Sequence, residues 1–541
     1  MSELRLQRTK PCSGRGLLIT LALVLAVPSA LAQHDMHDEA PVAAEADIGT
    51  VDFRADCDEA VRADFDHALA LMHHMMYQQA RGEFEAIAAT DPDCAMAHWG
   101  IATTLFQPLW GTTPSTEAIE RGRKAIERAA ETVDSEREQR LIEATAAFFG
   151  PETDRLWNRL PGWIEGIAEA FRAHPEDLDI AALYALSLLT EAQRAENAGA
   201  LHDEAESVLA EVWKKEPTHP GAVHYTIHAT DADGRAENAP DIVASYGEIA
   251  PEVPHALHMP SHIYVRLGDW PAVIDWNERS AAAAAGHRVG GALSFHYIHA
   301  IDYLVYGHLQ RGQDSRAEQV RDAAWKRHPH QGSFPGAFHL AAVPARLAVE
   351  RRDWQTAAAV EPRTPDYIAW DEFPWPEGIS WFARGLGAVH SDDLKGAREA
   401  ESRMAELARQ AESAADQRFA VYIETDRRIL DGWIAFAEGD AERAVESMRR
   451  AVELEASVEK HPVTPGALYP PGEALGDLLT ALERYEEALA AYEQSDAVWP
   501  GRHNTLRGAL RAADHAGDEE QARRWRERLA SSAPDSERWG D

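Results

Sequence analysis

A fixed spacing of 34 residues in the middle of the chain most constrains its fold. The following pairs keep this spacing without a gap: Pro217 and Pro251, Pro220 and Pro254, His224 and His258, His228 and His262. Periods of 20 to 50 residues are typical of arrays in which each unit packs only on its neighbours. The period therefore predicts an elongated repeat architecture for these 541 residues, in place of one compact core.

A second spacing identifies the type of unit. Between residues 468 and 500, Leu475-Gly476, Ala488, Tyr492 and Pro500 follow one another at gaps of 12, 4 and 8 residues. Small residues let two helices approach closely, and proline ends the second helix. This spacing resembles the tetratricopeptide repeat (TPR), a hairpin of two helices.

Looser versions of the same spacing recur in other parts of the chain. They are Trp381, Gly385 and Ala397; Gly432, Ala444 and Met448; and Ala80, Phe84 and Pro92. Apolar residues in these segments follow the i, i+3, i+4 spacing of amphipathic helices, and alternation with a period of two is missing. We therefore expect an all-α, TPR-like helical-hairpin solenoid with almost no strands.

A segment rich in proline and aromatic residues divides the chain. Residues 361–378 break the helical pattern, which predicts two stacked arrays: a degenerate solenoid with a His-rich centre over 51–360 and a second solenoid over 379–541. Trp370, Phe373 and Trp375 lie at this connector. They form either an exposed patch for a ligand or a loop packed down by its own aromatic rings, and the second is favoured.

The N-terminus has the pattern of an export signal. Basic residues precede an apolar run from Leu17 to Ala26, which ends in Ala30-Leu31-Ala32. This order predicts a cleaved signal peptide over 1–32, a flexible lead over 33–50, and a periplasmic or secreted mature protein. Cys57 and Cys94 then remain, and in an exported chain we expect them to form a disulfide; the alternative is two buried free thiols.

The charge of the chain restricts its partners. It has 53 Lys and Arg against 90 Asp and Glu, a formal net charge of -37. Such a charge repels phosphate backbones, so we expect no nucleic-acid partner. No segment approaches the roughly 18 apolar residues of a membrane helix, so we expect no membrane span. Oligomeric state does not follow from the sequence.

Histidines in register form the one group that suggests chemistry. His224 and His228, like His258 and His262, are i, i+4 pairs on the first helices of successive repeats, and His299 lies on the first helix of the next. Neutral imidazoles from neighbouring helices suit zinc or copper, oriented by carboxylates such as Asp231. The alternative, which is favoured, is a polar layer that is structural or contacts a ligand, its equal spacing copied by repeat duplication. For the run Met72–Met76, core packing is favoured.

Beyond the generic repeat, three segments resemble a poorly characterised group of exported bacterial TPR proteins. They run from Asp91 to Gly100, from His219 to Ala229 and from His255 to Tyr264, and the resemblance covers about 51–350. It implies architecture and compartment, not a reaction. The chain departs from the group's pattern at Thr190–Gln193.

Two functions follow as predictions. The first is an exported binding scaffold that holds a peptide or protein partner on its concave face, with a His-bound metal as an added feature. The second is a transition-metal-dependent enzyme or metal carrier that uses the His ladder. No familiar catalytic motif is present, so the sequence leaves open whether the protein is an enzyme.

Overall fold

A computed structural model of the chain describes residues 47–109, 114–153, 155–232, 234–238, 240–412 and 418–538. The predicted signal peptide and residues 33–46 of the predicted lead lie outside the described residues.

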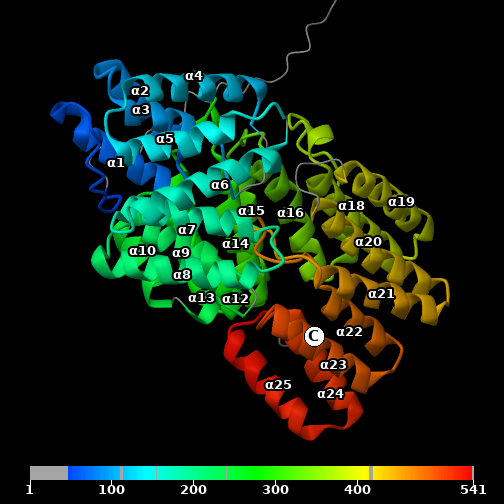
Figure 1. The fold of residues 1–541 in the computed structure, drawn as a ribbon. Helices are drawn as coiled ribbons and strands as arrows, with labels where there is room; N and C mark the ends of the chain where they lie inside the picture. Colours follow the sequence, from blue (N-terminus) through cyan, green and yellow to red (C-terminus); the bar gives the residue numbers. More distant parts are fainter. Residues whose placement is uncertain are drawn as a thin grey trace, which may run out of the picture. The chain divides into compact units, whose positions relative to one another are not determined.

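Helices make up most of the described chain (Figure 1). The first thirteen α-helices are α1 (Arg62–His73), α2 (Tyr77–Thr90), α3 (Ala95–Thr103), α4 (Thr116–Thr132), α5 (Glu136–Phe149), α6 (Leu156–Ala173), α7 (Leu178–Ala192), α8 (Ala198–Lys215), α9 (Pro220–Thr230), α10 (Pro240–Ile249), α11 (Pro254–His258), α12 (Pro260–Leu267) and α13 (Trp270–Ala284). They are followed by α14 (Phe295–Gln310), α15 (Asp314–Trp325), α16 (Phe334–Glu350), α17 (Trp354–Ala358), α18 (Pro374–His390), α19 (Leu394–Ala411), α20 (Arg418–Ala437), α21 (Ala441–Glu455), α22 (Pro471–Ala481), α23 (Tyr485–Val498), α24 (His503–Ala516) and α25 (Glu519–Ser532). Short 3-10 helices are η1 (Glu59–Val61), η2 (Ala236–Asn238) and η3 (Trp370–Glu372).

Strands are confined to one small hairpin in the described chain. β1 (Arg288–Val289) and β2 (Ala292–Leu293) pair antiparallel, and Leu293 also forms a single bridge with His330. Gly290 and Gly291 join the strands with positive φ angles, as a two-residue hairpin turn requires. The expectation of almost no strands is confirmed.

Consecutive helices pack in pairs, from α1 with α2 to α24 with α25 (Figure 1). The first helices of successive pairs also contact one another, as α16, α18, α20 and α22 do. Each unit therefore buries its apolar stripe on its own second helix and on the next unit. This is a TPR-like helical-hairpin solenoid, and the predicted all-α fold class is confirmed.

The TPR spacing follows from the packing of one tyrosine. Tyr492 on α23 is buried between Gly476 on α22 and Gly508 on α24. A Cβ atom at Gly476 would lie 2.6 Å from the Tyr492 ring. Only a residue without a side chain leaves room for this ring, which explains a small residue at that position of the repeat.

Replacing that glycine should therefore destabilise the array. We expect Gly476→Ala to lower the free energy of unfolding by about 1–3 kcal/mol, because the added methyl group overlaps the Tyr492 ring. Gly82 on α2 is the matched control, since no neighbouring atom lies within 4 Å of the place that its Cβ atom would take. Gly82→Ala should stabilise by about 0.5–1 kcal/mol through helix propensity. Urea unfolding measures both; equal effects of the two substitutions would contradict the packing argument.

Buried apolar side chains form two large clusters in the described chain, one over residues 48–263 and one over 281–529. Trp370 and Trp375 are buried in the second cluster and Phe373 packs against it, so the favoured interpretation of a loop packed down by its aromatic rings is correct. The boundaries 51–360, 361–378 and 379–541 stay predictions.

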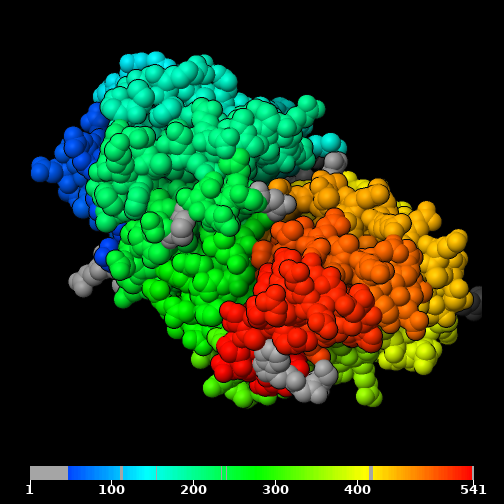
Figure 2. Space-filling view, turned by 90° about the horizontal axis from the view of Figure 1, so that it is seen from below, coloured from blue at the N-terminus to red at the C-terminus, as the bar shows by residue number. Residues whose placement is uncertain are grey.

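The last repeats also contact the middle of the chain. α24 packs against α14, and Trp270 Nε1 donates a hydrogen bond of 2.8 Å to the Gly501 carbonyl. Figure 2 shows the red residues after 500 against green residues of the middle of the sequence. The contact joins residues more than 200 positions apart, and no local pattern in the sequence predicts it.

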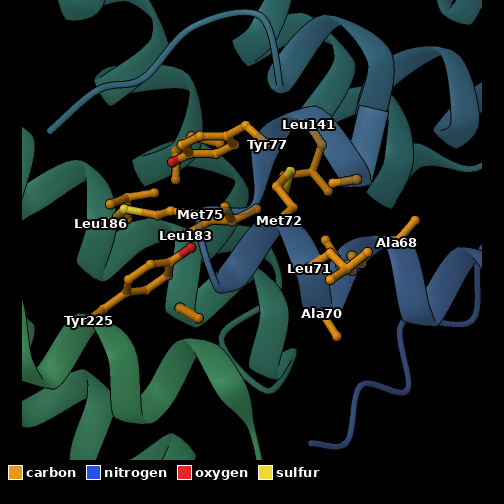
Figure 3. Packing of buried hydrophobic residues seen from close by; sticks show 14 of the residues in the cluster. Ala68, Ala70, Leu71, Met72, Met75, Tyr77, Leu141, Leu183, Leu186 and Tyr225 are labelled. Atoms are coloured by element: carbon orange, nitrogen blue, oxygen red, sulfur yellow. The ribbon is translucent and has the colours of Figure 1, made fainter. Parts of the chain in front are cut away.

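A disulfide and core packing stabilise the first described helices. Cys57 and Cys94 are bonded to each other, as predicted. Met72 and Met75 are buried beside Leu183, Leu186 and Tyr225 (Figure 3), so the prediction that the Met72–Met76 run packs in the core is correct.

None of the described helices has the length and apolar character needed to cross a membrane.

Candidate metal centre

Two prolines shape the segment that carries the central histidines. Pro254 begins α11 and Pro260 begins α12, so the two short helices follow each other with only Met259 between them. Proline is tolerated at the first position of a helix, where its missing N–H has no partner in any case. His258 thus closes α11 and His262 lies in the first turn of α12.

Three imidazoles meet at one point. Ligand atoms of His258, His262 and His299 all lie within 4.8 Å of one another, and all three side chains are buried. His258 Nε2 lies 3.0 Å from His262 Nε2. The ring of His299, from α14, lies 4.1 Å from the ring of His258.

Hydrogen bonds fix where the protons sit on two of these rings. Asn277 Nδ2 donates to the Val273 carbonyl at 2.7 Å, so its Oδ1 faces His258 and accepts from Nδ1–H at 2.8 Å. The carboxylate of Asp231 accepts from Nδ1–H of His262 at 2.9 Å. A neutral imidazole that donates through Nδ1 carries a lone pair on Nε2. His258 and His262 therefore direct two lone pairs at each other across 3.0 Å.

Asp231 is held ionised by its own neighbours. Arg266 Nε donates to it at 2.8 Å and Lys460 Nζ at 3.1 Å. Burial acts to raise the pKa of Asp231, but Lys460, Arg266 and His262 outweigh it and keep the pKa well below its usual value. The carboxylate can therefore only accept from His262, which favours the tautomer of that ring with its proton on Nδ1.

Burial also keeps the rings neutral. It lowers the pKa of His258 and His299 well below the ordinary value, and neighbouring histidines add to the effect. Burial lowers the pKa of His262 as well, partly opposed by Asp231. Neutral rings leave their lone pairs available, so protons do not compete with a metal ion for them.

His299 completes the group without any hydrogen bond of its own. Among the described residues, neither ring nitrogen of His299 has a partner, although both are buried. A buried polar atom without a partner costs about 1–3 kcal/mol. A metal ion bound to one ring nitrogen of His299 would remove this cost for that nitrogen.

The other two predicted ligands, His224 and His228, lie beside this group but outside it. Their rings are 5.0 Å apart on α9, and His224 Nδ1 donates to the His73 carbonyl at 2.7 Å. His255 stands between the two sets, 5.0 Å from the ring of His224 and 6.4 Å from that of His258. The five predicted ligands and His255 thus form a continuous array of imidazoles. Three of these imidazoles, those of His258, His262 and His299, converge.

A second cluster has similar residues but a different chemistry. Asp179 accepts from Nε2 of His73 at 2.9 Å and from Nε2 of His219 at 3.2 Å. The remaining nitrogens are also engaged: Tyr225 lies 3.1 Å from His73 Nδ1, and His219 Nδ1 accepts from the Ala222 N–H. Every ring nitrogen here is satisfied within the protein, so this cluster is structural.

Two residues that support the candidate centre have no signal in the sequence. Asn277 comes from α13 and Lys460 from the segment before α22, 229 positions after Asp231. Neither shares the 34-residue period. Asp231, in contrast, was predicted from the sequence to orient the histidine rings, since it follows His228 by three residues.

Comparisons with known proteins add little to this picture. No family model matches the chain, and no curated protein matches it. Among solved structures, a monomeric mutant of IFIT1 with m7Gppp-AAAA is similar at 11% sequence identity and a TM-score of 0.36, over 89% of this chain and 97% of that chain. A likeness of this size says nothing about a ligand, and the fold class stands on the helical hairpins themselves.

Proposed function

We propose that this protein binds a transition metal ion, zinc or copper, through His258, His262 and His299. The observation that carries the proposal is the pair of Nε2 atoms 3.0 Å apart, both with their Nδ1 protons committed to oxygen acceptors. Two facing lone pairs repel each other unless a cation lies between them. Neutral imidazoles commonly bind transition metal ions through such lone pairs.

The spacing suits a metal after a small adjustment. Tetrahedral coordination at about 2.0–2.1 Å puts ligand nitrogens about 3.3 Å apart. The 3.0 Å separation of His258 Nε2 and His262 Nε2 is slightly shorter, and the third ligand atom lies within 4.8 Å of both. Asp231 and Asn277 would orient the ligands in the way that carboxylates and amides commonly support metal-bound histidines.

Three histidine ligands leave one coordination position for water or a substrate. Such a set supports either a metal carrier or a metal-dependent enzyme, because an open position permits both exchange and Lewis-acid chemistry. The all-imidazole donor set favours zinc and copper over magnesium and calcium, which prefer oxygen.

Metal content tests the proposal. The mature protein is loaded separately with zinc and with copper, dialysed, and analysed by plasma mass spectrometry. We expect about one ion per chain, as a three-histidine site should hold, and near zero in His258→Ala plus His262→Ala. His299→Leu should lose the ion while keeping the fold, because the His299 ring nitrogens have no partner among the described residues. The control is His515→Ala, on the exposed side of α24.

Either of two results would overturn the metal proposal: substoichiometric metal in the unmodified protein, or equal metal in the unmodified protein and the double variant. Circular dichroism of each variant separates loss of the site from loss of the fold.

The broader function proposed from the sequence is an exported scaffold with a peptide or protein on its concave face. It is supported by the solenoid, whose first helices contact one another in series. Export is supported by the Cys57–Cys94 disulfide, since such bonds persist in oxidising compartments. The metal centre has the more specific support, because it rests on named atoms and distances.

A further inference from the structure

A cavity that none of the three candidate histidine ligands lines lies mainly in the second half of the chain. Its volume is about 240 Å³, and its wall comes from α12, α16, α18, α20, α21, α22, α23 and the segment between α21 and α22. Typical small-molecule pockets measure about 300–1,000 Å³. The cavity is slightly smaller than that range, so it suits a small ligand and not a folded peptide.

Aromatic rings form the apolar part of the wall. Phe338, Trp375, Tyr422 and Trp499 line it, and the rings of Trp375 and Tyr422 stack at 4.6 Å. Apolar walls with a few placed polar groups are the usual composition of a small-molecule site. The polar groups then decide which ligand fits.

Two basic residues in the lining, Lys460 and Arg346, have N–H groups that could donate to a ligand. Lys460 donates to Asp231 at 3.1 Å and to the Thr464 carbonyl at 3.5 Å, which leaves one of its three N–H groups free among the described residues. Arg346 pairs with Asp302 through Nε at 2.9 Å. Within the described segments, its two terminal nitrogens donate only to the Gly466 carbonyl, at 3.3–3.4 Å.

The local charge favours an anionic group at these donors. Lys460 and Arg266 share the single carboxylate of Asp231, and Arg346 is balanced by Asp302. Glu459 lies 3.6 Å from Arg266 but is more than half exposed, so water screens it. Glu455 also lines the cavity and accepts from Trp499 Nε1 at 2.9 Å. The remaining N–H groups of Lys460 and Arg346 are cationic donors, with which a ligand carboxylate would pair.

An acidic residue, Asp426, also lines this cavity. It lies on α20 and makes no hydrogen bond or ion pair in the described chain, although it lines the cavity. Burial, with a contribution from nearby Glu455, raises the pKa of Asp426 well above its usual value. A cationic ligand group beside Asp426 would pair with its carboxylate and release the proton.

We infer that this cavity binds a small zwitterion with an apolar side chain, with the ligand carboxylate at Lys460 and Arg346 and the ligand ammonium at Asp426. The aromatic wall would enclose the side chain. A free amino acid and a short peptide share this chemistry, and the cavity volume limits the peptide to about two residues.

Isothermal titration calorimetry on the mature protein tests the inference. The probes are L-phenylalanine, L-phenylalanylglycine, 3-phenylpropanoate, which lacks the ammonium, and phenethylamine, which lacks the carboxylate. We expect at least one zwitterion to bind, and each analogue to bind about tenfold or more weakly, because it leaves a charged partner unsatisfied. Tighter binding of L-phenylalanine than of the dipeptide identifies free amino acids as the source, and the reverse identifies peptides.

Asp426→Asn is the decisive variant. It keeps the shape of the side chain, and the native carboxyl has no partner in the described chain whose loss would unfold the protein. We expect it to weaken zwitterion binding about tenfold or more, to leave 3-phenylpropanoate binding unchanged, and to abolish the proton release seen on titration in buffers of different ionisation enthalpy. The matched control is Glu446→Gln, an exposed carboxylate on α21.

No saturable binding of either zwitterion, or equal zwitterion affinity in Asp426→Asn and the unmodified protein, would overturn the inference. Neither result bears on the metal proposal, because His258, His262 and His299 do not line this cavity.

Discussion

Arg502→Met should lower the free energy of unfolding by about 3–5 kcal/mol, because it removes the cation that pairs with the buried Glu350 and one of the two cations that pair with the buried Glu473. Arg502 is fully buried before α24, 2.8 Å from Glu350 and 3.1 Å from Glu473, and it donates to the Tyr306 hydroxyl at 2.6 Å. These residues join α14, α16 and α22 to α24. Urea unfolding followed by tryptophan fluorescence measures the loss.

The control for this prediction is Arg526→Met. Arg526 pairs with Asp514 at 3.3 Å, but both side chains are more than half exposed. Exposed pairs contribute about 0–1 kcal/mol, so this change should have little effect. Equal losses from the two substitutions would show that the buried network does not stabilise the contact between the last repeats and the middle of the chain.

The same network should make stability depend on pH. Burial acts to raise the pKa of Glu473, but Arg502 and Arg352 outweigh it and hold the pKa below the ordinary value of 4.5. A carboxyl group with a lowered pKa in the folded state stabilises the protein above pH 4.5, and this contribution is lost as the pH falls further. Unfolding midpoints measured from about pH 6 down to about pH 3 should therefore fall less steeply in Arg502→Met.

Asn277→Ala should weaken metal binding about 10–100-fold, although Asn277 touches no metal in the proposed site. Its Oδ1 accepts the Nδ1 proton of His258 at 2.8 Å. Without that acceptor, the proton can move to Nε2 and occupy the lone pair that would bind the metal. Competition with a chelator of known affinity measures the change for zinc and for copper.

Asn277→Asp separates this tautomer effect from simple damage to the fold. The carboxylate keeps an acceptor toward His258, so metal affinity should stay within about a factor of ten of the original. Asn238→Ala, at an exposed asparagine in η2, is the neutral control. Equal affinities in Asn277→Ala and the unmodified protein would show that Asn277 does not set the tautomer of His258.

The fold class could be predicted because its signals are local. Gly476 and Tyr492 belong to one hairpin, and their spacing follows from how two neighbouring helices pack. Cys57 and Cys94 could be paired because only two cysteines remain after residue 50. These inferences need no knowledge of how the repeats are arranged in space.

The candidate site could be predicted only in part. The i, i+4 spacing predicted that His258 and His262 lie together, and the order of repeats predicted His299 near them. The two residues do lie together, although Met259 divides their segment into the short helices α11 and α12. The 34-residue period predicted His224 and His228 as ligands equally with His258 and His262. In the structure α9 instead contacts α1, and His224 donates a hydrogen bond to the His73 carbonyl. The small rotation between successive repeats, which the sequence pattern does not express, decides such contacts.

The sequence by itself determined the helical hairpins, the disulfide and the identity of the candidate ligands, since each depends on spacing along the chain. Only the tertiary structure decided which nitrogens carry lone pairs and which groups line the separate cavity. Asn277 and Lys460 reach His258 and Asp231 from other helices and loops. Hydrogen-bond partners distant in sequence set protonation and charge, and these are properties of the folded arrangement alone.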